Sequence, residues 1–392
     1  MTITVALRRL AGASDNLPVL VVGPSLGTSA ATLWTAAANA LGDSLRVLAW
    51  DLPGHGGAPA TTEAYTVADL ATALAAAVER LDEPGVHYAG DSLGAAVGLQ
   101  LALDRPDLVR TATLCCTGAR IGAAESWADR ARTVRAEGTA SIADASADRW
   151  FAPGFADRDP DTAQDLLQAL RDTDDESYAL ACEALAGFDL RGSLHAVRAP
   201  VLAVAGQDDA VTPVESLRAI AAGVVDGALS IVPDAAHLVP AEQPQELATL
   251  IASHALRPRT EAELHAAGAA VRREVLGGAH VDRAGGGRIG QEFQSFITRY
   301  AWGSIWTRPG LARRDRSLIT LAALVAGGHH EELALHLRAA RRNGLSEREI
   351  IETLLQTAIY CGVPAANTAF RIAEQVLGET DGETDDPAAT TR

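Results

Sequence analysis

The hydrophobic pattern of the chain changes near residue 256. Before that point, short apolar runs alternate with Ala-rich stretches in which apolar residues recur every three or four positions, as at 69–81 and 93–103. The runs predict buried strands and the stretches predict amphipathic helices. Strands that alternate with helices indicate a mostly parallel sheet covered by helices on both faces. The runs lie at 17–22, 45–51, 86–89, 111–115 and 201–205.

The strand pattern disappears between about 122 and 195. This stretch is acidic and helical in spacing, and it contains Trp127, Trp150, Phe151 and Phe155. We interpret it as a helical lid inserted into the α/β domain. Its tryptophans Trp127 and Trp150 are candidate substrate contacts.

From residue 261 onward the apolar spacing is helical throughout, which predicts an all-α domain. A polar, Pro-containing joint at 257–260 separates it from the α/β domain. We therefore expect an α/β domain at 1–256 and an all-α domain at 261–378. The tail at 379–392 is rich in Asp, Glu, Thr and Ala and is predicted to be disordered. The expected helices of the second domain are 261–276, 290–300, 310–327, 330–343, 346–360 and 364–377.

Charge excludes several classes of function. All 33 basic residues are arginines, so a P-loop lysine and Schiff-base catalysis by lysine are excluded. The formal charge of −17 falls on residues 1–256, which argues against general nucleic-acid binding. An arginine cluster at 313–316 makes Arg313 and Arg316 candidate contacts for an anionic substrate. Apolar runs too short for a membrane helix and four cysteines without disulfide or zinc spacing predict a cytoplasmic protein.

A serine lies in the pattern of a nucleophile elbow. Gly-Asp-Ser-Leu-Gly, with Ser92 at its centre, follows a predicted strand and opens a predicted helix. An acid and a histidine should follow in that order. Asp209 comes after the strand at 201–205, and His237 precedes the last helix of the domain. Asp208 is a rival acid, although the spacing from Gly206 favours Asp209.

An oxyanion hole needs one backbone N–H from the residue after the nucleophile and one from an early loop. The loop at 23–27 follows the first buried strand. Leu93 and Leu26 are therefore the candidate donors.

These motifs carry a family resemblance across residues 1–256. The segments 51–56, 91–94, 206–213 and 237–244 resemble the α/β-hydrolases. The loop at 25–28 with Trp34 behind it, and 149–151 in the lid, are more similar to the 3-oxoadipate enol-lactonases. A serine at the elbow argues against haloalkane dehalogenases and epoxide hydrolases, which use aspartate there. Ordinary serine esterases and cofactor-free haloperoxidases share the triad and remain alternatives.

The helical domain has its own cluster of ionisable residues at 329–336. His329, Glu332 and His336 are spaced to share one helix face, and His330 lies beside them. Such a set could bind a metal, transfer protons or simply form an exposed helix start.

Residues 268–377 resemble the carboxymuconolactone decarboxylases, a family that also includes the alkylhydroperoxidase D proteins. The latter use a C-x-x-C-x-x-x-H motif. Here His336 matches its histidine, while His329 and Glu332 occupy the cysteine positions, so disulfide relay chemistry is excluded. The motifs that carry the resemblance are 272–277, 300–303, 306–310, 329–336 and 360–364.

The resemblance implies decarboxylation with no cofactor and no metal. The departing carboxylate is vinylogous to the lactone carbonyl, which can accept the electrons. Arginines would hold the dianion, and a histidine or carboxylic acid would deliver a proton to carbon. The choice of proton donor among His329, His330, Glu332 and His336 stays open.

The two resemblances together predict a bifunctional enzyme of protocatechuate breakdown that acts on small lactone carboxylates. The helical domain would decarboxylate γ-carboxymuconolactone, and the α/β domain would hydrolyse the resulting enol-lactone. We also expect a homo-oligomer assembled through the helical domain. The alternative is a serine esterase or haloperoxidase with a catalytically silent oligomerisation domain.

Overall fold

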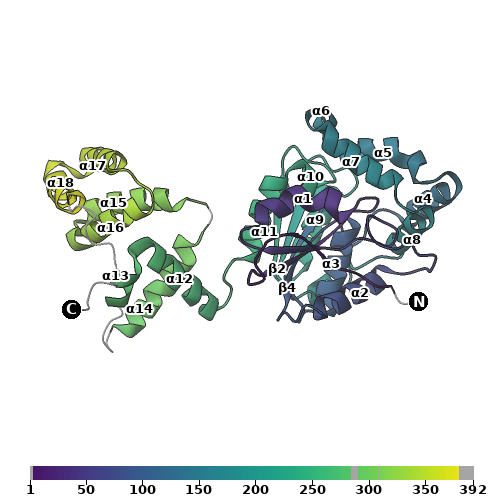
Figure 1. Ribbon diagram of the computed structural model, residues 1–392, viewed down its shortest axis with the longest axis horizontal. Helices are drawn as coiled ribbons and strands as arrows, with labels where there is room; N and C mark the ends of the chain where they lie inside the picture. Colours follow the sequence, from purple (N-terminus) through teal and green to yellow (C-terminus); the bar gives the residue numbers. More distant parts are fainter. Residues whose placement is uncertain (1–2, 284–289, 309, 379–392) are drawn as a thin grey trace, which may run out of the picture. The chain divides into compact units, whose positions relative to one another are not determined.

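The computed structural model describes residues 3–283, 290–308 and 310–378. The chain divides into two compact units, Met1–Arg257 and Pro258–Arg392 (Figure 1). The tail for which disorder was predicted lies outside the described residues. In the described part of the chain, no helix has both the length and the apolar character needed to cross a membrane.

The first unit is built on a seven-stranded sheet in the order β1-β3-β2-β4-β5-β6-β7. β1 pairs antiparallel with β3, and the other neighbours are parallel. The central strands are buried along most of their length, in agreement with the apolar runs. The strands are β1 Arg8–Ala11, β2 Val19–Gly23, β3 Arg46–Ala49, β4 Val86–Asp91, β5 Val109–Cys115, β6 Val201–Gly206 and β7 Gly227–Val232.

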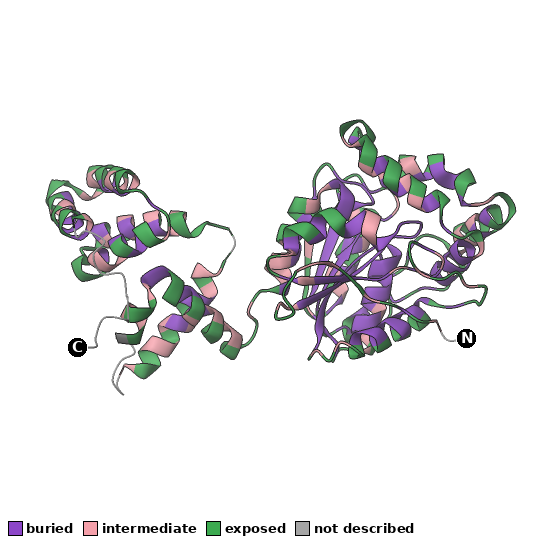
Figure 2. Ribbon diagram, viewed as in Figure 1, coloured by how far each residue is buried: buried purple, intermediate pink, exposed green. Residues whose placement is uncertain are grey.

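Helices lie on both sides of this sheet (Figure 1). α1 packs against α11, α2 packs against α3, and α9 contacts β6 and β7. Figure 2 shows the result as a buried sheet inside helices with exposed outer faces. The helices are α1 Ala30–Leu41, α2 Val67–Glu79, α3 Leu93–Asp104, α9 Val214–Gly223, α10 Val239–Glu242 and α11 Pro244–Ala255.

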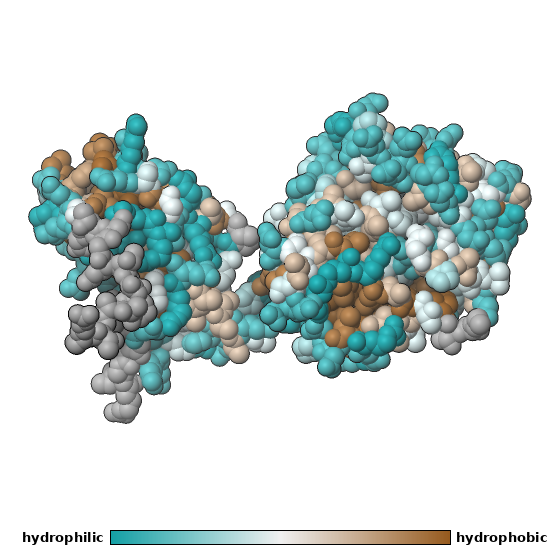
Figure 3. Space-filling model, in the orientation of Figure 1, coloured by the Kyte–Doolittle hydropathy of each residue, from teal (hydrophilic) through white to brown (hydrophobic). Residues whose placement is uncertain are grey.

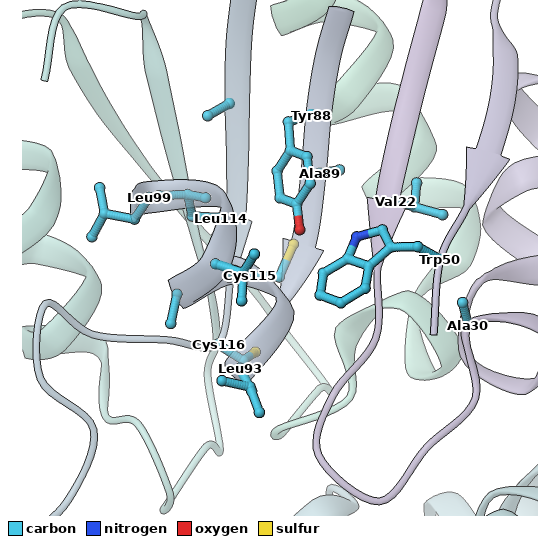
Figure 4. Packing of buried hydrophobic residues seen from close by; sticks show 14 of the residues in the cluster. Val22, Ala30, Trp50, Tyr88, Ala89, Leu93, Leu99, Leu114, Cys115 and Cys116 are labelled. Carbon is cyan, nitrogen blue, oxygen red and sulfur yellow. The ribbon is translucent and has the colours of Figure 1, made fainter. Parts of the chain in front are cut away.

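Tyr88 on β4 fixes the start of α3 against the sheet. Its ring is fully buried beside Trp50 (Figure 4), and its hydroxyl donates a hydrogen bond to the carbonyl oxygen of Gly94 over 2.6 Å. A Cβ on Gly98 would lie 2.0 Å from the Tyr88 ring, so the helix needs glycine there to approach the strand. The β4–α3 junction is thereby held rigidly.

The lid between β5 and β6 is helical. α4 packs on α8, and Arg135 of α4 forms ion pairs with Glu176 and Glu183 of α8. The lid elements are α4 Ala124–Glu137, η1 Thr139–Ile142, α5 Ala143–Trp150, α6 Phe155–Arg158, α7 Pro160–Arg171, α8 Asp175–Ala186 and η2 Leu194–Ala196.

The described part of the second unit is helical and contains two hydrophobic clusters. One is formed by α15, α16, α17 and α18 around Leu321, Leu337 and Leu354. The other joins α12 to η3 and α16 around Val275 and Trp302. The helices are α12 Glu261–Leu276, α13 Gly278–Arg283, α14 Gln291–Ile297, η3 Thr298–Trp306, α15 Arg313–Gly327, α16 His330–Arg342, α17 Glu347–Cys361 and α18 Val363–Leu377.

The expectation of one α-helix over 290–300 needs correction. α14 ends at Ile297 and continues as η3, a π-helix of nine residues. η3 crosses α12 at two glycines, where a Cβ on Gly268 would lie 2.0 Å from the carbonyl oxygen of Thr298 and one on Gly303 would lie 2.2 Å from that of Leu264. The two backbones therefore touch closely at this crossing.

Candidate active site

Ser92 stands at the sharp turn between β4 and α3. Its backbone has φ 52° and ψ −114°, a conformation that residues other than glycine rarely adopt. The turn is possible because glycines flank it. A Cβ on Gly94 would lie 2.4 Å from the carbonyl oxygen of Pro24, and one on Gly90 would lie 2.6 Å from the backbone of Gly94. The sequence pattern therefore produces a strained turn with Ser92 at its apex.

The structure brings Ser92, His237 and Asp209 together in a hydrogen-bonded row. Nε2 of His237 lies 3.0 Å from Oγ of Ser92, and Nδ1 of His237 lies 2.9 Å from Oδ2 of Asp209. All three side chains are buried. In this arrangement the imidazole can take the serine proton while the carboxylate stabilises the imidazolium that forms.

Asp209 is held as a carboxylate by its surroundings. It accepts hydrogen bonds from the backbone N–H groups of Val211 and Thr212 over 2.7 and 3.0 Å, and from the Thr212 hydroxyl over 2.6 Å. Burial alone would raise the pKa of Asp209, but the charge of His237 and these hydrogen bonds outweigh it and hold the pKa below its usual value. The rival Asp208 is exposed, so the geometry favours Asp209.

A buried glutamate ties the histidine loop to the lid, and sequence reasoning missed it. Oε1 of Glu242 accepts hydrogen bonds from the backbone N–H groups of Ala236 and Leu238 over 2.8 and 3.4 Å. Oε2 accepts one from Ala152 in the lid over 2.6 Å. Burial raises the pKa of Glu242 above its usual value. Glu242 lies in the segment 237–244 that carries the hydrolase resemblance, which was the available signal.

The two proposed oxyanion donors lie beside the serine turn. The early loop is fixed to the start of α3 by a hydrogen bond from the Gly94 N–H to the Pro24 carbonyl over 2.9 Å. Leu93 is the first residue of α3, so its N–H has no acceptor within the helix. The Leu26 N–H forms no hydrogen bond with another described residue. Both groups are available to a substrate oxygen.

A pocket that is partly open to solvent lies over Ser92 and His237. The two tryptophans expected to contact substrate, Trp127 and Trp150, line it. Two lid arginines, Arg130 and Arg149, also line it; the sequence singled out Arg149 as part of the family motif at 149–151 but selected neither as a substrate contact. The other lining residues are Ser25, Leu26, Ser146, Tyr178 and Val211.

Cys116 extends this cluster of reactive groups. Within the ranges that the structure describes, one group of three potential metal ligands is found, namely Cys116, Asp209 and His237, whose ligand atoms lie within 4.8 Å of one another. Asp209 and His237 already hydrogen-bond each other, and the Cys116 thiol donates to the Ala236 carbonyl over 3.4 Å. These contacts occupy the atoms that a metal would need.

In the helical unit, the histidine segment lies at the start of α16. His329 immediately precedes the helix. His329, His330 and Glu332 are exposed, while His336 is partly buried. Burial lowers the pKa of His336, Glu332 opposes this shift, and His280 adds to it. His336 is therefore in the electrostatic range of Glu332 and of His280, which the sequence did not single out.

The two arginines expected to bind substrate in this unit have partners within the chain. Arg313 forms an ion pair with Glu274, and Arg316 donates a hydrogen bond to the Arg308 carbonyl over 2.7 Å. Arg272 of α12 is almost completely buried; it lies 3.4 Å from the Thr298 hydroxyl.

Comparison with known proteins separates the same two parts of the chain. Residues 18–244 match the alpha/beta hydrolase fold family, and residues 291–375 match the carboxymuconolactone decarboxylase family. The chain is 33% identical over 241 residues to 3-oxoadipate enol-lactonase 2 of Acinetobacter baylyi, covering 62% of this chain and 90% of that protein. It is 47% identical over 112 residues to the 4-carboxymuconolactone decarboxylase of the same organism, covering 28% of this chain and 84% of that protein.

A solved structure shows the same relationship. The enol-lactonase from Burkholderia xenovorans LB400 superimposes with a TM-score of 0.60 at 30% identity, covering 63% of this chain and 94% of that one.

Proposed function

Since the chain belongs to the α/β hydrolase family in its first unit and to the carboxymuconolactone decarboxylase family in its second, we propose that it performs two consecutive reactions of protocatechuate breakdown in the β-ketoadipate pathway. The helical unit decarboxylates γ-carboxymuconolactone to 3-oxoadipate enol-lactone. The first unit hydrolyses that lactone to 3-oxoadipate. The proposal rests above all on a hydrogen-bonded Ser92–His237–Asp209 row in the unit that resembles enol-lactonases.

Hydrolysis begins with attack of Ser92 Oγ on the lactone carbonyl, while His237 takes the hydroxyl proton. The N–H groups of Leu26 and Leu93 stabilise the oxyanion. Collapse of the intermediate breaks the ring C–O bond and leaves an acyl-serine. The leaving group is an enolate, which gains a proton to become the ketone of the product. Water activated by His237 then releases the second carboxylate.

Decarboxylation needs an electron sink, which the substrate supplies. The C–C bond to the departing carboxylate breaks, and its electrons pass to the vinylogous lactone carbonyl. The resulting dienolate takes a proton on carbon to give the enol-lactone. We infer that His336, which is partly buried with Glu332 in electrostatic range, moves that proton. His329, His330 and Glu332 are exposed at the N-terminal end of α16 and are the other candidates.

Incubation with γ-carboxymuconolactone tests both steps at once. The wild-type protein should release CO2 and form 3-oxoadipate. The Ser92→Ala variant should release CO2 at an unchanged rate and accumulate enol-lactone, because its hydrolysis should fall about 10³-fold or more. Absence of CO2 from the wild type would overturn the decarboxylase assignment. Formation of 3-oxoadipate by Ser92→Ala above the spontaneous rate would show that Ser92 is not the nucleophile.

We also propose that the helical unit associates with a second copy of the chain. Large apolar side chains are exposed mainly on this unit, and brown atoms gather over α17 and α18 (Figure 3). Leu355 and Ile359 lie one helical turn apart on α17, and Val363 is the first residue of α18. Residues 257–392 contain 17 arginines and 17 acidic residues, so net charge repulsion does not oppose self-association of this unit. The other exposed members on this unit are Phe293, Phe296, Tyr300, Ile305, Leu311, Ile319 and Tyr360.

A cytoplasmic location fits this activity. All four cysteines are free thiols, which suits a reducing compartment. We propose this compartment for the protein.

A further inference from the structure

Two positively charged side chains of the lid line the pocket over Ser92. Arg130 comes from α4 and Arg149 from α5. Among the residues that the structure describes, neither forms an ion pair with a carboxylate. Their neighbours on α4 differ, since Arg132 pairs with Asp129 and Arg135 with two glutamates of α8. Neither arginine over the pocket is therefore neutralised by a carboxylate of the lid.

Arg130 is fixed in direction by neutral partners. Its Nε donates to the Tyr178 hydroxyl over 2.8 Å, and its Nη2 donates to Oγ of Ser146 over 2.9 Å. The guanidinium carbon lies 5.7 Å from the centre of the Tyr178 ring. Tyr178 and Ser146 are themselves buried. The guanidinium is thus held rigidly and keeps N–H groups for a further acceptor.

Arg149 has no hydrogen bond or ion pair with another described residue. Burial lowers the pKa of Arg149, and the nearby charge of Arg130 lowers it further. Two like charges that face one pocket repel each other, and an anion bound between them would relieve this repulsion. Arginine forks also match the geometry of a carboxylate.

We propose that Arg130 and Arg149 form a carboxylate subsite that selects lactones and esters carrying a free carboxylate a few atoms from the reacting carbonyl. This inference rests on the proposed function of the first unit and adds the residues that select its substrate. The subsite anchors the arm of the substrate, while Ser92 and the N–H groups of Leu26 and Leu93 act on the ring carbonyl. Selection then depends on charge as well as on the shape of the tryptophan-lined pocket.

The test compares two lactones that differ in the arm alone. 3-Oxoadipate enol-lactone carries a carboxymethyl arm, and α-angelica lactone is the same enol-lactone ring with a methyl group instead. Arg149→Gln breaks no hydrogen bond of the lid, so it is a clean variant. We expect kcat/KM for the carboxylated lactone to fall about 100-fold, mainly through KM, and that for α-angelica lactone to stay within about threefold. Arg149→Lys should recover part of the loss.

Arg132→Gln is the matched control, because Arg132 lies on α4 and pairs with Asp129 at the surface. It should change neither rate. An equal loss on both lactones in Arg149→Gln would overturn the subsite, while enol-lactone hydrolysis by the wild type would leave the proposed function standing.

A binding measurement separates the two proposals further. Adipate, the product skeleton without its oxo group, should bind the wild-type protein in calorimetry and bind Arg149→Gln at least 10-fold more weakly. If the wild type hydrolysed neither lactone but adipate binding still required Arg149, the proposed function would fail and the subsite would remain. Adipate binding that is unaffected by the substitution would overturn the subsite.

Discussion

The backbone N–H of His237 donates a hydrogen bond to the carbonyl oxygen of Trp150 over 3.0 Å. Trp150 is the last residue of lid helix α5 and lines the pocket. The proposed general base and the lid are therefore directly joined, and Glu242 strengthens the connection by accepting N–H groups from both segments. Movement of the lid should disturb the histidine that it covers.

Glu242→Gln should weaken this connection. An amide keeps one acceptor oxygen, and its NH2 group would face a backbone N–H of Ala152 or Ala236. A buried donor left without a partner costs about 1–3 kcal/mol. We expect a loss of that size in the free energy of unfolding of the first unit, measured in urea, and about a 10-fold lower kcat for lactone hydrolysis. Glu246→Gln, at an exposed position on α11, is the control, and equal effects of both substitutions would contradict the prediction.

Asp91→Asn should stabilise the protein at neutral pH. Burial, followed by the charges of Asp209 and Glu242, raises the pKa of Asp91 well above its usual value, and both carboxyl oxygens are buried. An acid whose pKa is raised by folding contributes stability below its unfolded pKa, and this contribution is lost as pH rises through the folded pKa. Asparagine at position 91 cannot ionise, so the variant does not lose this stability as the pH rises. The melting temperature of the variant should exceed that of the wild type at pH 8, and this difference should become smaller toward pH 4. A difference that is the same at both pH values would contradict the prediction.

His336→Ala should remove decarboxylation and spare hydrolysis. Loss of a general acid or base usually costs about 10²–10⁴-fold in rate. CO2 release from γ-carboxymuconolactone measures the loss, and hydrolysis of added enol-lactone serves as an internal control for folding. His265→Ala, at an exposed position on α12, should retain both activities. If His336→Ala released CO2 at the wild-type rate, another residue would have to transfer the proton.

Charge placed on the exposed apolar residues at the end of α17 and the start of α18 should dissociate the oligomer. Ile359→Glu combined with Val363→Glu changes two of the most exposed apolar side chains of the helical unit, and burying these charges between copies would be costly. Light scattering after size exclusion should give a smaller mass for the variant, with helical content unchanged. Ile231→Glu, on edge strand β7, should keep the wild-type mass. A monomeric wild type would contradict the assembly proposal.

Burial decided which parts of the fold could be predicted. Strands β2 to β6 have long buried stretches, so each appears in the sequence as an apolar run. β1 and β7 were missed because they form the edges of the sheet, and most of their residues are partly or fully exposed. η3 was missed because the apolar spacing of nine residues does not distinguish a π-helix from an α-helix.

The site was predictable where its residues belong to local motifs. Ser92, Asp209 and His237 follow strand ends in a recognisable order. Arg149 belongs to the family motif at 149–151, which does not show where its side chain points, and Arg130 belongs to no motif, because an arginine on an amphipathic helix is typical of a solvated face. Their approach to Ser92 depends on how α4 and α5 fold over the sheet, which periodicity alone does not specify.

The hydrophobic clusters show how the chain is subdivided, since each is formed within one unit. A substitution that unfolds the core of one unit can leave the core of the other unit intact. Mutations can therefore change either unit during evolution without loss of the other. Because both units are synthesised as one polypeptide, they are nevertheless always present in a one-to-one ratio. Neither catalyst can then be overproduced relative to the other, whatever the strength of the promoter.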